Sequence, residues 1–268
     1  MNAKRMWLAL MLFTLFARPA LAWEAPCMDE PYGWRYEDEQ RSIVISQVSE
    51  SDLTYFVADV QLADASVWKS AFSDTLEPLS SLVAGTDAVL AINGDDFGTH
   101  RYGIILRNGE LLREHDTTRH MLIVANDGDL RMVTDRKANG YKALADRLRA
   151  ENVWQAYEFG PALVENGEAL PFPKSFDVIS TRSTRKEPRT AIGQLAPLHY
   201  CIIVVDGRRP GYSDGISLQG LQQLFLRYGA QTAFNLDGGG STEMWFQGEI
   251  INQPSGDHKR KLSDIICF

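Results

Sequence analysis

Three consecutive glycines constrain the fold of this chain more than any other stretch of its sequence. Each glycine loses more backbone entropy on folding than any other residue, so Gly238, Gly239 and Gly240 disfavour both helix and strand here. Strand-like apolar runs flank them at residues 231–236 and 242–246. The pattern predicts a tight loop between two strands. The loop is either a glycine-rich hairpin turn or a site where backbone amides approach an anionic ligand.

The first 22 residues have the order of a secretory signal peptide. Lys4 and Arg5 precede an apolar run over residues 6–17, and Ala20 and Ala22 follow with the small-residue spacing of a cleavage site. The apolar run is too short for a comfortable membrane span. We therefore expect cleavage after Ala22, a mature chain in the periplasm or outside the cell, and no stable membrane span. An uncleaved N-terminal anchor is the alternative.

The charge balance excludes one class of partner. The chain carries a net charge of −8, and removal of Lys4, Arg5 and Arg18 with the signal peptide would take it to −11. Nonspecific nucleic-acid binding needs clustered lysine and arginine, so we expect no nucleic-acid partner. Anionic small molecules stay open as ligands, because local arginines can outweigh the net charge.

The chain has three cysteines, all within the expected mature part. Cys201 lies in the apolar run 200–205 and is expected to be a buried free thiol. Cys27 and Cys267 lie near the two chain ends, which often meet at a domain surface. In an oxidising compartment these two cysteines are candidates for a disulfide. The cysteine and histidine spacings do not indicate a structural zinc site.

Alternating and continuous apolar runs predict most of the secondary structure. Three turns, at residues 108–109, 126–128 and 166–167, separate short apolar runs and predict hairpins. Other strands are expected at residues 42–48, 53–62, 88–92, 189–194, 199–205, 231–236 and 242–246. Helices are expected at residues 75–83, 142–150 and 218–228, the last capped by Gly229. The sequence thus predicts an α+β or mixed α/β fold. We expect a single domain over residues 23–268, built on a mixed, largely antiparallel β-sheet with flanking helices.

Four polar clusters stand at the ends of the predicted strands, at residues 93–96, 189, 206–209 and 235–241. Each alone could be an ordinary turn or a surface charge. Their shared position at strand ends favours one common site, because function often resides in loops held by such a scaffold.

The same clusters resemble the phosphodiester glycosidase family. The resemblance rests on "RTAIG" at residues 189–193, "VVDGRRPGYSDGISLQGLQQLFLRYGA" at 204–230 and "NLDGGGS" at 235–241. "GPALVENGE" at 160–168 and "AINGDDF" at 91–97 fit upstream segments, and residues 189–268 are the most specific part. One departure is Asp95-Asp96, where the family usually has small or aromatic residues. These carboxylates could refuse an anionic group, bind a cation, or form a solvated acidic loop.

The resemblance implies a hydrolase that cleaves between a sugar's anomeric carbon and a phosphodiester oxygen, with a phosphosugar or glycan phosphodiester as substrate. The signal-peptide pattern predicts that this hydrolase is exported. The phosphate leaves as an anion, so strong general-acid help is less necessary than in ordinary glycoside hydrolysis. Asp206 and Asp237 are the candidate catalytic carboxylates. Arg189 and Arg208 suit the phosphate, because a planar guanidinium can make paired hydrogen bonds. The remaining candidates contact substrate or shape the loop: Asn93, Gly207, Asn235, Gly238, Gly239, Gly240 and Ser241.

Other interpretations stay open at this point. A Ser241 nucleophile is disfavoured, because the segment is not a GxSxG elbow and the sequence around the histidines does not mark any of them as a catalytic partner for the serine. A noncatalytic envelope protein could keep the pocket for binding alone. A metal-dependent phosphodiesterase could use Asp95, Asp96, Asp206 and Asp237. No cofactor is firmly implied, and the sequence leaves open whether a divalent cation is bound.

Overall fold

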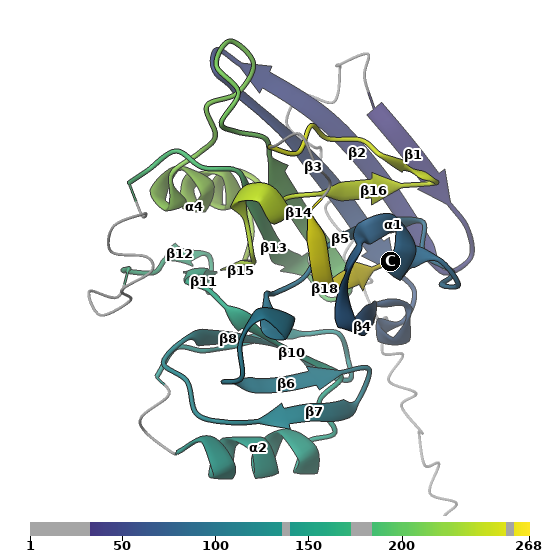
Figure 1. The fold of residues 1–268 in the computed structure, drawn as a ribbon, viewed down its shortest axis with the longest axis vertical. Helices are drawn as coiled ribbons and strands as arrows, with labels where there is room; N and C mark the ends of the chain where they lie inside the picture. Colours follow the sequence, from purple (N-terminus) through teal and green to yellow (C-terminus); the bar gives the residue numbers. More distant parts are fainter. Residues whose placement is uncertain (1–32, 136–139, 173–183, 256–259) are drawn as a thin grey trace, which may run out of the picture.

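The computed structural model describes residues 33–135, 140–172, 184–255 and 260–268, and these form three antiparallel β-sheets with few helices (Figure 1). The predicted signal peptide and Cys27 lie outside the described residues. Among the described residues, no helix is both long enough and apolar enough to cross a membrane.

The first sheet has eight strands and carries most of the candidate site. Its order is β1 (Gly33–Glu37), β2 (Arg41–Glu50), β3 (Leu53–Leu62), β14 (His199–Val205), β13 (Arg189–Ala196), β15 (Thr232–Asn235), β11 (Ala162–Glu165) and β12 (Glu168–Ala169). Helix α4 (Leu218–Arg227) covers one face, where Leu221 and Phe225 pack against Ala191 and Ile203. The Ser217 hydroxyl caps this helix by accepting from the Gly220 amide at 3.0 Å. The helix therefore ties the loop before Leu218 to the end of the sheet.

The second and third sheets have five strands each. The second has the order β7 (Glu110–Glu114), β6 (Ile104–Arg107), β10 (Gln155–Phe159), β8 (His120–Val124) and β9 (Leu130–Val133), and α2 (Tyr141–Ala150) packs on it. The third has the order β17 (Glu249–Ile250), β16 (Met244–Phe246), β5 (Leu90–Asn93), β18 (Lys261–Cys267) and β4 (Lys69–Pro78), with α1 (Leu79–Val83) against it. Short 3₁₀ turns complete the structure: η1 (Ala65–Val67), η2 (Phe97–Thr99) and η3 (Gly239–Ser241).

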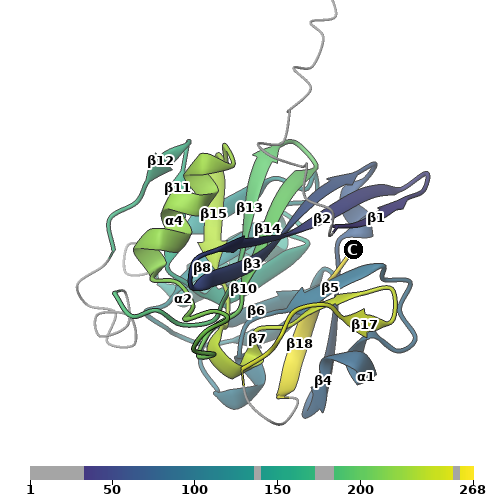
Figure 2. The same cartoon turned by 90° about the horizontal axis from the view of Figure 1, so that it is seen from above.

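One hydrophobic core is shared by all three sheets. Ile45 of β2, Tyr157 of β10, Ile92 of β5 and Phe268 at the chain end are all buried in it. The view from above shows the third sheet lying beside the first, with α4 on the opposite flank of the first sheet (Figure 2). The three sheets therefore stabilise one another, because each buries apolar surface against the others.

The predicted antiparallel character is confirmed, whereas the proportion of helix is lower than an α/β fold requires. Every paired strand in the described ranges is antiparallel. The predicted helix at 75–83 was wrong in its first half, because β4 extends through Pro78 by pairing with β18 and the helix begins only at Leu79. Strands β1, β10 and β18 were not predicted.

Cys201 and Cys267 are both buried, and the described residues include no disulfide partner for either of them. The expectation for Cys201 is confirmed. The Cys27–Cys267 pairing stays a prediction, because Cys27 lies outside the described residues.

Candidate functional site

Antiparallel register brings three of the predicted polar clusters to one end of the first sheet. Arg189 at the start of β13 pairs with Val205 at the end of β14, so Asp206 follows directly beside it. Ala191 pairs with Asn235 at the end of β15, and the Leu236 amide donates to the Thr190 carbonyl at 2.9 Å. The glycine loop after β15 therefore starts next to Arg189.

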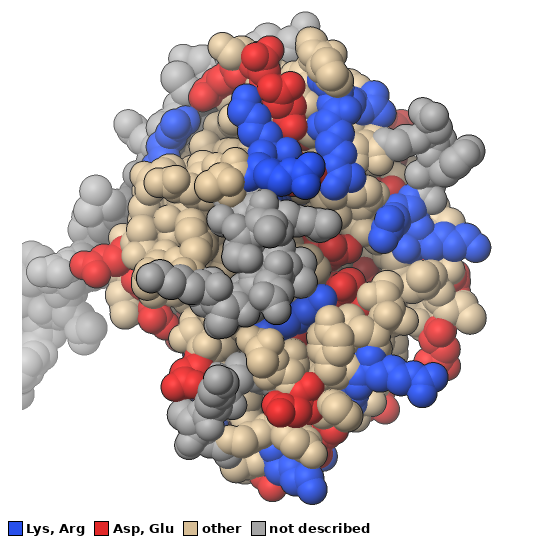
Figure 3. Space-filling view, turned by 60° about the vertical axis from the view of Figure 1, so that its left-hand side comes forward, with Lys and Arg blue, Asp and Glu red and all other residues tan. Residues whose placement is uncertain are grey.

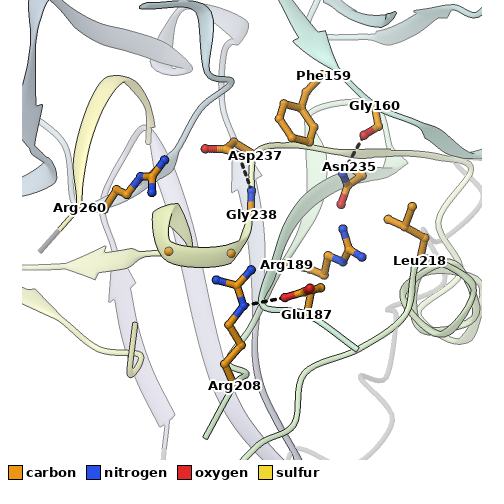
Figure 4. A pocket seen from close by; sticks show the side chains of 12 residues that line it. Phe159, Gly160, Glu187, Arg189, Arg208, Leu218, Asn235, Asp237, Gly238 and Arg260 are labelled. Carbon is orange, nitrogen blue, oxygen red and sulfur yellow. Dashed lines mark hydrogen bonds and ion pairs between the residues drawn. The ribbon is translucent and has the colours of Figure 1, made fainter. Parts of the chain in front are cut away.

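A cavity of about 220 Å³ opens at this end of the sheet (Figure 4). Three arginines, two carboxylates and one aromatic ring contribute to its wall. The lining residues are Phe159, Gly160, Glu187, Arg189, Arg208, Leu218, Asn235, Asp237, Gly238, Gly239, Gly240 and Arg260. The combination of guanidinium groups, carboxylates and an aromatic ring suits a ligand that carries both an anionic group and a sugar ring.

The glycines of the loop are required by close packing. A Cβ on Gly238 would lie 2.8 Å from the Pro188 carbonyl oxygen, and a Cβ on Gly239 would lie 3.1 Å from the Arg208 guanidinium. Gly239 also has a φ of +62°, a backbone conformation that favours glycine. The absence of side chains therefore lets the turn η3 lie directly against Arg208.

The predicted nest of three amides is not formed as such. The Gly238 N–H donates to Asp237 Oδ1 at 2.8 Å, and the Gly239 N–H donates to the Pro188 carbonyl at 2.9 Å. Within the described part of the chain, only the Gly240 amide of the three is left without a hydrogen bond. The arginines therefore supply most of the positive charge of this site, and the amides supply little.

Arg208 and Arg189, the two predicted phosphate-binding residues, both line the cavity. Arg208 is held by Glu187, with 2.6 Å between Nε and Oε2, and its own φ is +59°. A left-handed backbone at a residue other than glycine is strained, and such strain is often kept at functional sites. Arg189 is buried, and its Nε donates to the Ile216 carbonyl at 3.4 Å. Both guanidinium groups are therefore anchored before any ligand binds.

Asp237 is the carboxylate best placed for chemistry. It lines the cavity between Arg260 and Phe159 (Figure 4). Burial raises the pKa of this carboxyl to about 6; a hydrogen bond from Ser241 opposes the rise, and the charge of Asp96 adds to it. A carboxyl whose pKa lies close to neutral can exchange protons at the pH of the reaction.

Asp206, the other predicted catalytic carboxylate, is not among the residues that line the cavity, and its catalytic role stays a prediction. It is almost fully buried and accepts hydrogen bonds from Tyr212 Oη at 2.8 Å, from Asn252 Nδ2 at 2.8 Å and from the Gln253 amide at 2.9 Å. Burial raises its pKa, and the bonds from Gln253, Asn252 and Tyr212 oppose that rise. We assign Asp206 a positioning role, because it connects the end of β14 to the segment after β17.

Asn93, Gly207 and Ser241 also stand behind the wall of the cavity. The Asn93 Nδ2 donates to the Asp237 carbonyl at 2.8 Å, so this side chain braces the loop. Gly207 is packed so closely that a Cβ would lie 2.8 Å from Gly215 Cα. Ser241 is buried beside Asp237. The loop-shaping alternative therefore fits all three residues better than direct substrate binding.

Asn235 does line the cavity, and its two side-chain groups differ. Its Nδ2 donates to the Gly160 carbonyl at 2.8 Å, whereas its Oδ1 is buried and has no hydrogen-bond partner among the residues that the structure describes. An unsatisfied buried acceptor costs about 1–3 kcal/mol. A ligand hydroxyl that donates to Oδ1 would remove this cost, so Asn235 suits recognition of a sugar hydroxyl.

Five lining residues were missed by sequence reasoning. Gly160 lies in a segment that was interpreted only as a hairpin, and Phe159 precedes it. Glu187 stands two residues before Arg189, which could have suggested its role. No sequence pattern indicated Leu218 or Arg260, because their position depends on how the loops pack.

The acidic pair in the loop after β5 is engaged by arginines. Asp95 Oδ2 lies 2.9 Å from Arg107, and Asp96 contacts both Arg119 and His100. Burial alone would raise the pKa of Asp96, but the bonds from His100 and Arg119 lower it to about 2. Among the described residues, there is no group of three or more histidine, cysteine, aspartate or glutamate side chains that could hold a metal ion. The geometry therefore gives no support to a metal site built from Asp95, Asp96, Asp206 and Asp237.

Comparison with known proteins agrees with the resemblance. The model of the phosphodiester glycosidase family matches residues 86–268. A curated relative, the SPbeta prophage-derived uncharacterized protein YomE of Bacillus subtilis strain 168, is 28% identical over 216 residues. The alignment covers 74% of this chain but only 32% of the relative, so the chain spans about a third of that protein's length.

Three solved structures share the fold. The zebrafish N-acetylglucosamine-1-phosphodiester alpha-N-acetylglucosaminidase catalytic domain, auto-inhibited by its pro-peptide, aligns with a TM-score of 0.66 and 18% identity, over 85% of this chain and 82% of that one. A hypothetical protein from Synechocystis aligns with a TM-score of 0.68 and 14% identity, over 89% and 64%. A putative exported protein from Burkholderia pseudomallei aligns with a TM-score of 0.57 and 16% identity, over 80% and 74%.

Proposed function

Because this chain belongs to the phosphodiester glycosidase family, we propose that it hydrolyses a sugar 1-phosphodiester to a free sugar and a phosphomonoester. The single observation that supports this reaction most is Asp237, a carboxyl with a pKa raised to about 6, on the wall of a cavity that also holds three arginines. The arginines suit the phosphate, and the carboxyl suits the anomeric carbon.

The phosphate is bound and stabilised by guanidinium groups in this proposal. Arg189 and Arg208 lie near the same end of the glycine turn, and each is already anchored by the protein. Charge-assisted hydrogen bonds of this kind contribute about 1.5–3 kcal/mol each. They strengthen as negative charge builds up on the departing phosphate, which lowers the barrier for breaking the bond to the sugar.

Asp237 acts in its ionised form. The carboxylate either activates a water molecule, attacks the anomeric carbon, or stabilises the positive charge that develops on the sugar ring. Phe159 offers an apolar face to the ring, and Asn235 Oδ1 accepts from a hydroxyl. Because this carboxylate must be ionised, kcat/KM should rise with pH, reach half of its maximum near pH 6 and level off about one pH unit higher.

We further propose that the protein acts outside the cytoplasm, on a glycan phosphodiester of the cell surface. The support is the signal-peptide pattern of residues 1–22. Fractionation of cells that produce the full chain, with sequencing of the mature N-terminus, tests this proposal. Recovery only in the cytoplasm with the N-terminus intact would contradict it.

The reaction is tested with a panel of sugar 1-phosphodiesters that differ in the sugar, with release of free sugar as the readout. Wild type is compared with Asp237→Asn and with Asp146→Asn, an exposed aspartate on α2 that serves as control. We expect turnover by wild type and the control, and at least a 100-fold loss in Asp237→Asn. Full activity of Asp237→Asn would overturn the assignment, and binding without turnover by wild type would indicate a binding protein.

The bond that breaks is identified separately. Hydrolysis in water enriched in the heavy oxygen isotope places the label on the sugar if the anomeric carbon–oxygen bond breaks. A phosphodiesterase places the label on the phosphate and, if it depends on a metal, loses activity with a chelator. We expect label on the sugar.

A further inference from the structure

Arg119 lies between the wall of the cavity and the acidic loop after β5. Strand β8 begins at His120, which pairs with Phe159 at the end of β10, so the residue before β8 reaches a residue of the cavity wall. The Arg119 guanidinium stands over the Phe159 ring, with 5.1 Å from Cζ to the ring centroid, and over the Tyr102 ring at 5.0 Å. A cation over an aromatic ring attracts that ring, so Arg119 helps to fix the position of Phe159.

The same guanidinium binds both carboxylate oxygens of Asp96. Its Nη2 donates to Oδ2 at 3.2 Å, and its Nη1 contacts Oδ1. Nη1 also donates to the Glu158 carbonyl at 3.4 Å, and His100 Nε2 lies 3.1 Å from Asp96 Oδ1. The Arg119 and Asp96 side chains are only 15% and 21% exposed. A bidentate pair that is shielded from water in this way is stronger than an ion pair at the surface.

The loop that carries Asp96 lies against Asp237. The Asp237 amide donates to the Gly94 carbonyl at 3.3 Å, and Asn93 Nδ2 donates to the Gly94 carbonyl at 3.3 Å and to the Asp237 carbonyl at 2.8 Å. Asp96 follows two residues after Gly94, and its charge raises the pKa of Asp237. Without a cation beside it, the Asp96 carboxylate would repel an ionised Asp237 more strongly.

We propose that Arg119 is a positioning residue of this site, which holds both the Phe159 ring on the cavity wall and the Asp96 carboxylate in the loop beside Asp237. Arg119 is not among the residues that line the cavity, so it acts through these two side chains. It keeps the ring in place for the sugar. It also neutralises part of the negative charge near Asp237, so that Asp237 ionises at a lower pH than it would without the arginine. This inference rests on the proposed function.

Other charged groups lie near the two carboxylates. On the face shown in Figure 3, acidic side chains are visible in a hollow that lysine and arginine side chains border. The charged residues that line the cavity with Asp237 are Glu187, Arg189, Arg208 and Arg260. Those around Asp96 and Arg119 are Asp95, His100, Arg107 and Asp264. All of them are retained in the variants below, so a change in the ionisation of Asp237 reports on Arg119 and Asp96.

The pH dependence of kcat/KM tests the effect of Arg119 on charge. Wild type is compared with Arg119→Gln, Asp96→Asn and the double variant. Arg131→Gln is the matched control, because Arg131 is an exposed arginine on β9 of the same sheet and also pairs with a carboxylate, that of Glu151, at 3.6 Å. In Arg119→Gln the acid limb should move to higher pH by about half a pH unit, which lowers kcat/KM about threefold on that limb. The control should not move the limb.

Two further variants separate charge from disruption of the fold. Adding Asp96→Asn to Arg119→Gln should bring the limb back to its wild-type position or below it, because the unpaired carboxylate is removed. Arg119→Lys keeps the positive charge, so its limb should stay closer to wild type than that of Arg119→Gln. An unmoved limb in Arg119→Gln, or a double variant that keeps the upward shift, would overturn the proposal.

The contact with the Phe159 ring is tested by KM at a pH on the plateau of the profile. Arg119→Gln should raise KM about fivefold when Phe159 is present and leave it unchanged in Phe159→Leu, because the arginine then has no ring to hold. The comparison is repeated in Asp96→Asn protein, where removal of Arg119 leaves no unpaired carboxylate and folding is preserved. Equal rises of KM with and without the ring would contradict this contact.

A measurement without substrate separates this inference from the hydrolytic function. The full chain is labelled with carbon-13 at the aspartate carboxyls, and the NMR signal that Asp237→Asn lacks is followed as the pH is changed. Its midpoint should be higher in Arg119→Gln than in wild type and Arg131→Gln, even if no substrate of the panel is hydrolysed. The signal belongs to Asp237 alone, so protonation of His100 is not mistaken for it. An equal midpoint contradicts the inference, whatever the outcome for hydrolysis.

Discussion

Asn93 holds the backbone of Asp237: its side-chain Nδ2 donates a 2.8 Å hydrogen bond to the Asp237 carbonyl oxygen. The Oδ1 of the same asparagine accepts from Thr190 Oγ1 at 2.6 Å and from the Glu243 amide at 3.3 Å. One buried side chain thus joins the loop after β5, strand β13 and both sides of the glycine turn. The position of the candidate catalytic carboxylate therefore depends on a residue that does not line the cavity.

Replacement of Asn93 should reduce both stability and activity. Asn93→Ala leaves the Thr190 hydroxyl and the Asp237 carbonyl without their partner, which we expect to lower the free energy of unfolding by about 1–3 kcal/mol. Misplacement of Asp237 should lower kcat about 100-fold. Asn108→Ala is the control, because Asn108 also bridges two segments, through Ser70, and is not among the residues that line the cavity. Equal activity losses in the two variants, measured beside urea denaturation, would contradict the positioning role.

Asp237→Asn should be inactive but more stable than wild type. Burial raises the pKa of the folded-state carboxyl from 3.8 to about 6, so the folded protein binds this proton more tightly than the unfolded chain. Stability therefore falls as pH rises from about 4 to about 6, by up to about 3 kcal/mol. Above this pH range Asp237 is ionised, and the neutral asparagine removes the free-energy cost of burying that charge. Urea denaturation of both proteins at about pH 7.5 and about pH 4 measures the difference, which should be present only at the higher pH.

Removal of the Asp96 charge should shift the pH profile. Asp96 has a pKa of about 2 and is ionised at any assay pH, and its charge raises the pKa of Asp237. Arg260 acts in the opposite direction. In Asp96→Asn the acid limb of the kcat/KM profile should therefore move to lower pH. Asp146→Asn on the exposed face of α2 should leave the limb in place, and a shift of the Asp96 variant to higher pH would contradict this electrostatic coupling.

Gly239 and Gly248 allow two reasons for a glycine to be separated: a backbone conformation with positive φ, and a close contact that leaves no room for a side chain. Both have positive φ values, +62° and +106°, so alanine at either position should cost about 1 kcal/mol of stability. A Cβ at Gly248 meets no atom within 4 Å, whereas a Cβ at Gly239 lies 3.1 Å from the Arg208 guanidinium. Only Gly239→Ala should raise KM, because Arg208 must move. Steady-state kinetics and thermal denaturation of both variants distinguish the effects, and an unchanged KM in Gly239→Ala would show that Arg208 does not bind substrate.

Some features were determined by local sequence. Gly238, Gly239 and Gly240 could not lie in a helix or strand, and the turn η3 follows from this. The alternating residues of β2 and β3, the hairpin at Asn108-Gly109 and the apolar face of α4 were also predictable, because each depends on neighbours in the chain. The motifs around Arg189 and Asp237 carried the family resemblance, and the family model confirms it.

Only the tertiary structure decided which polar residues face the cavity. Asp206 and Asp237 both follow buried strands and looked equivalent in the sequence. Asn252 and Gln253, which are distant in the chain, donate hydrogen bonds to the Asp206 carboxylate and enclose it. Asp237 instead lies on the cavity wall. Arg260 and Glu187 reach the site through loops whose course no local pattern specifies. Hydrogen-bond partners distant in the chain, and the burial they impose, set the charge and role of each side chain, so its chemistry could not be predicted from its neighbours in sequence.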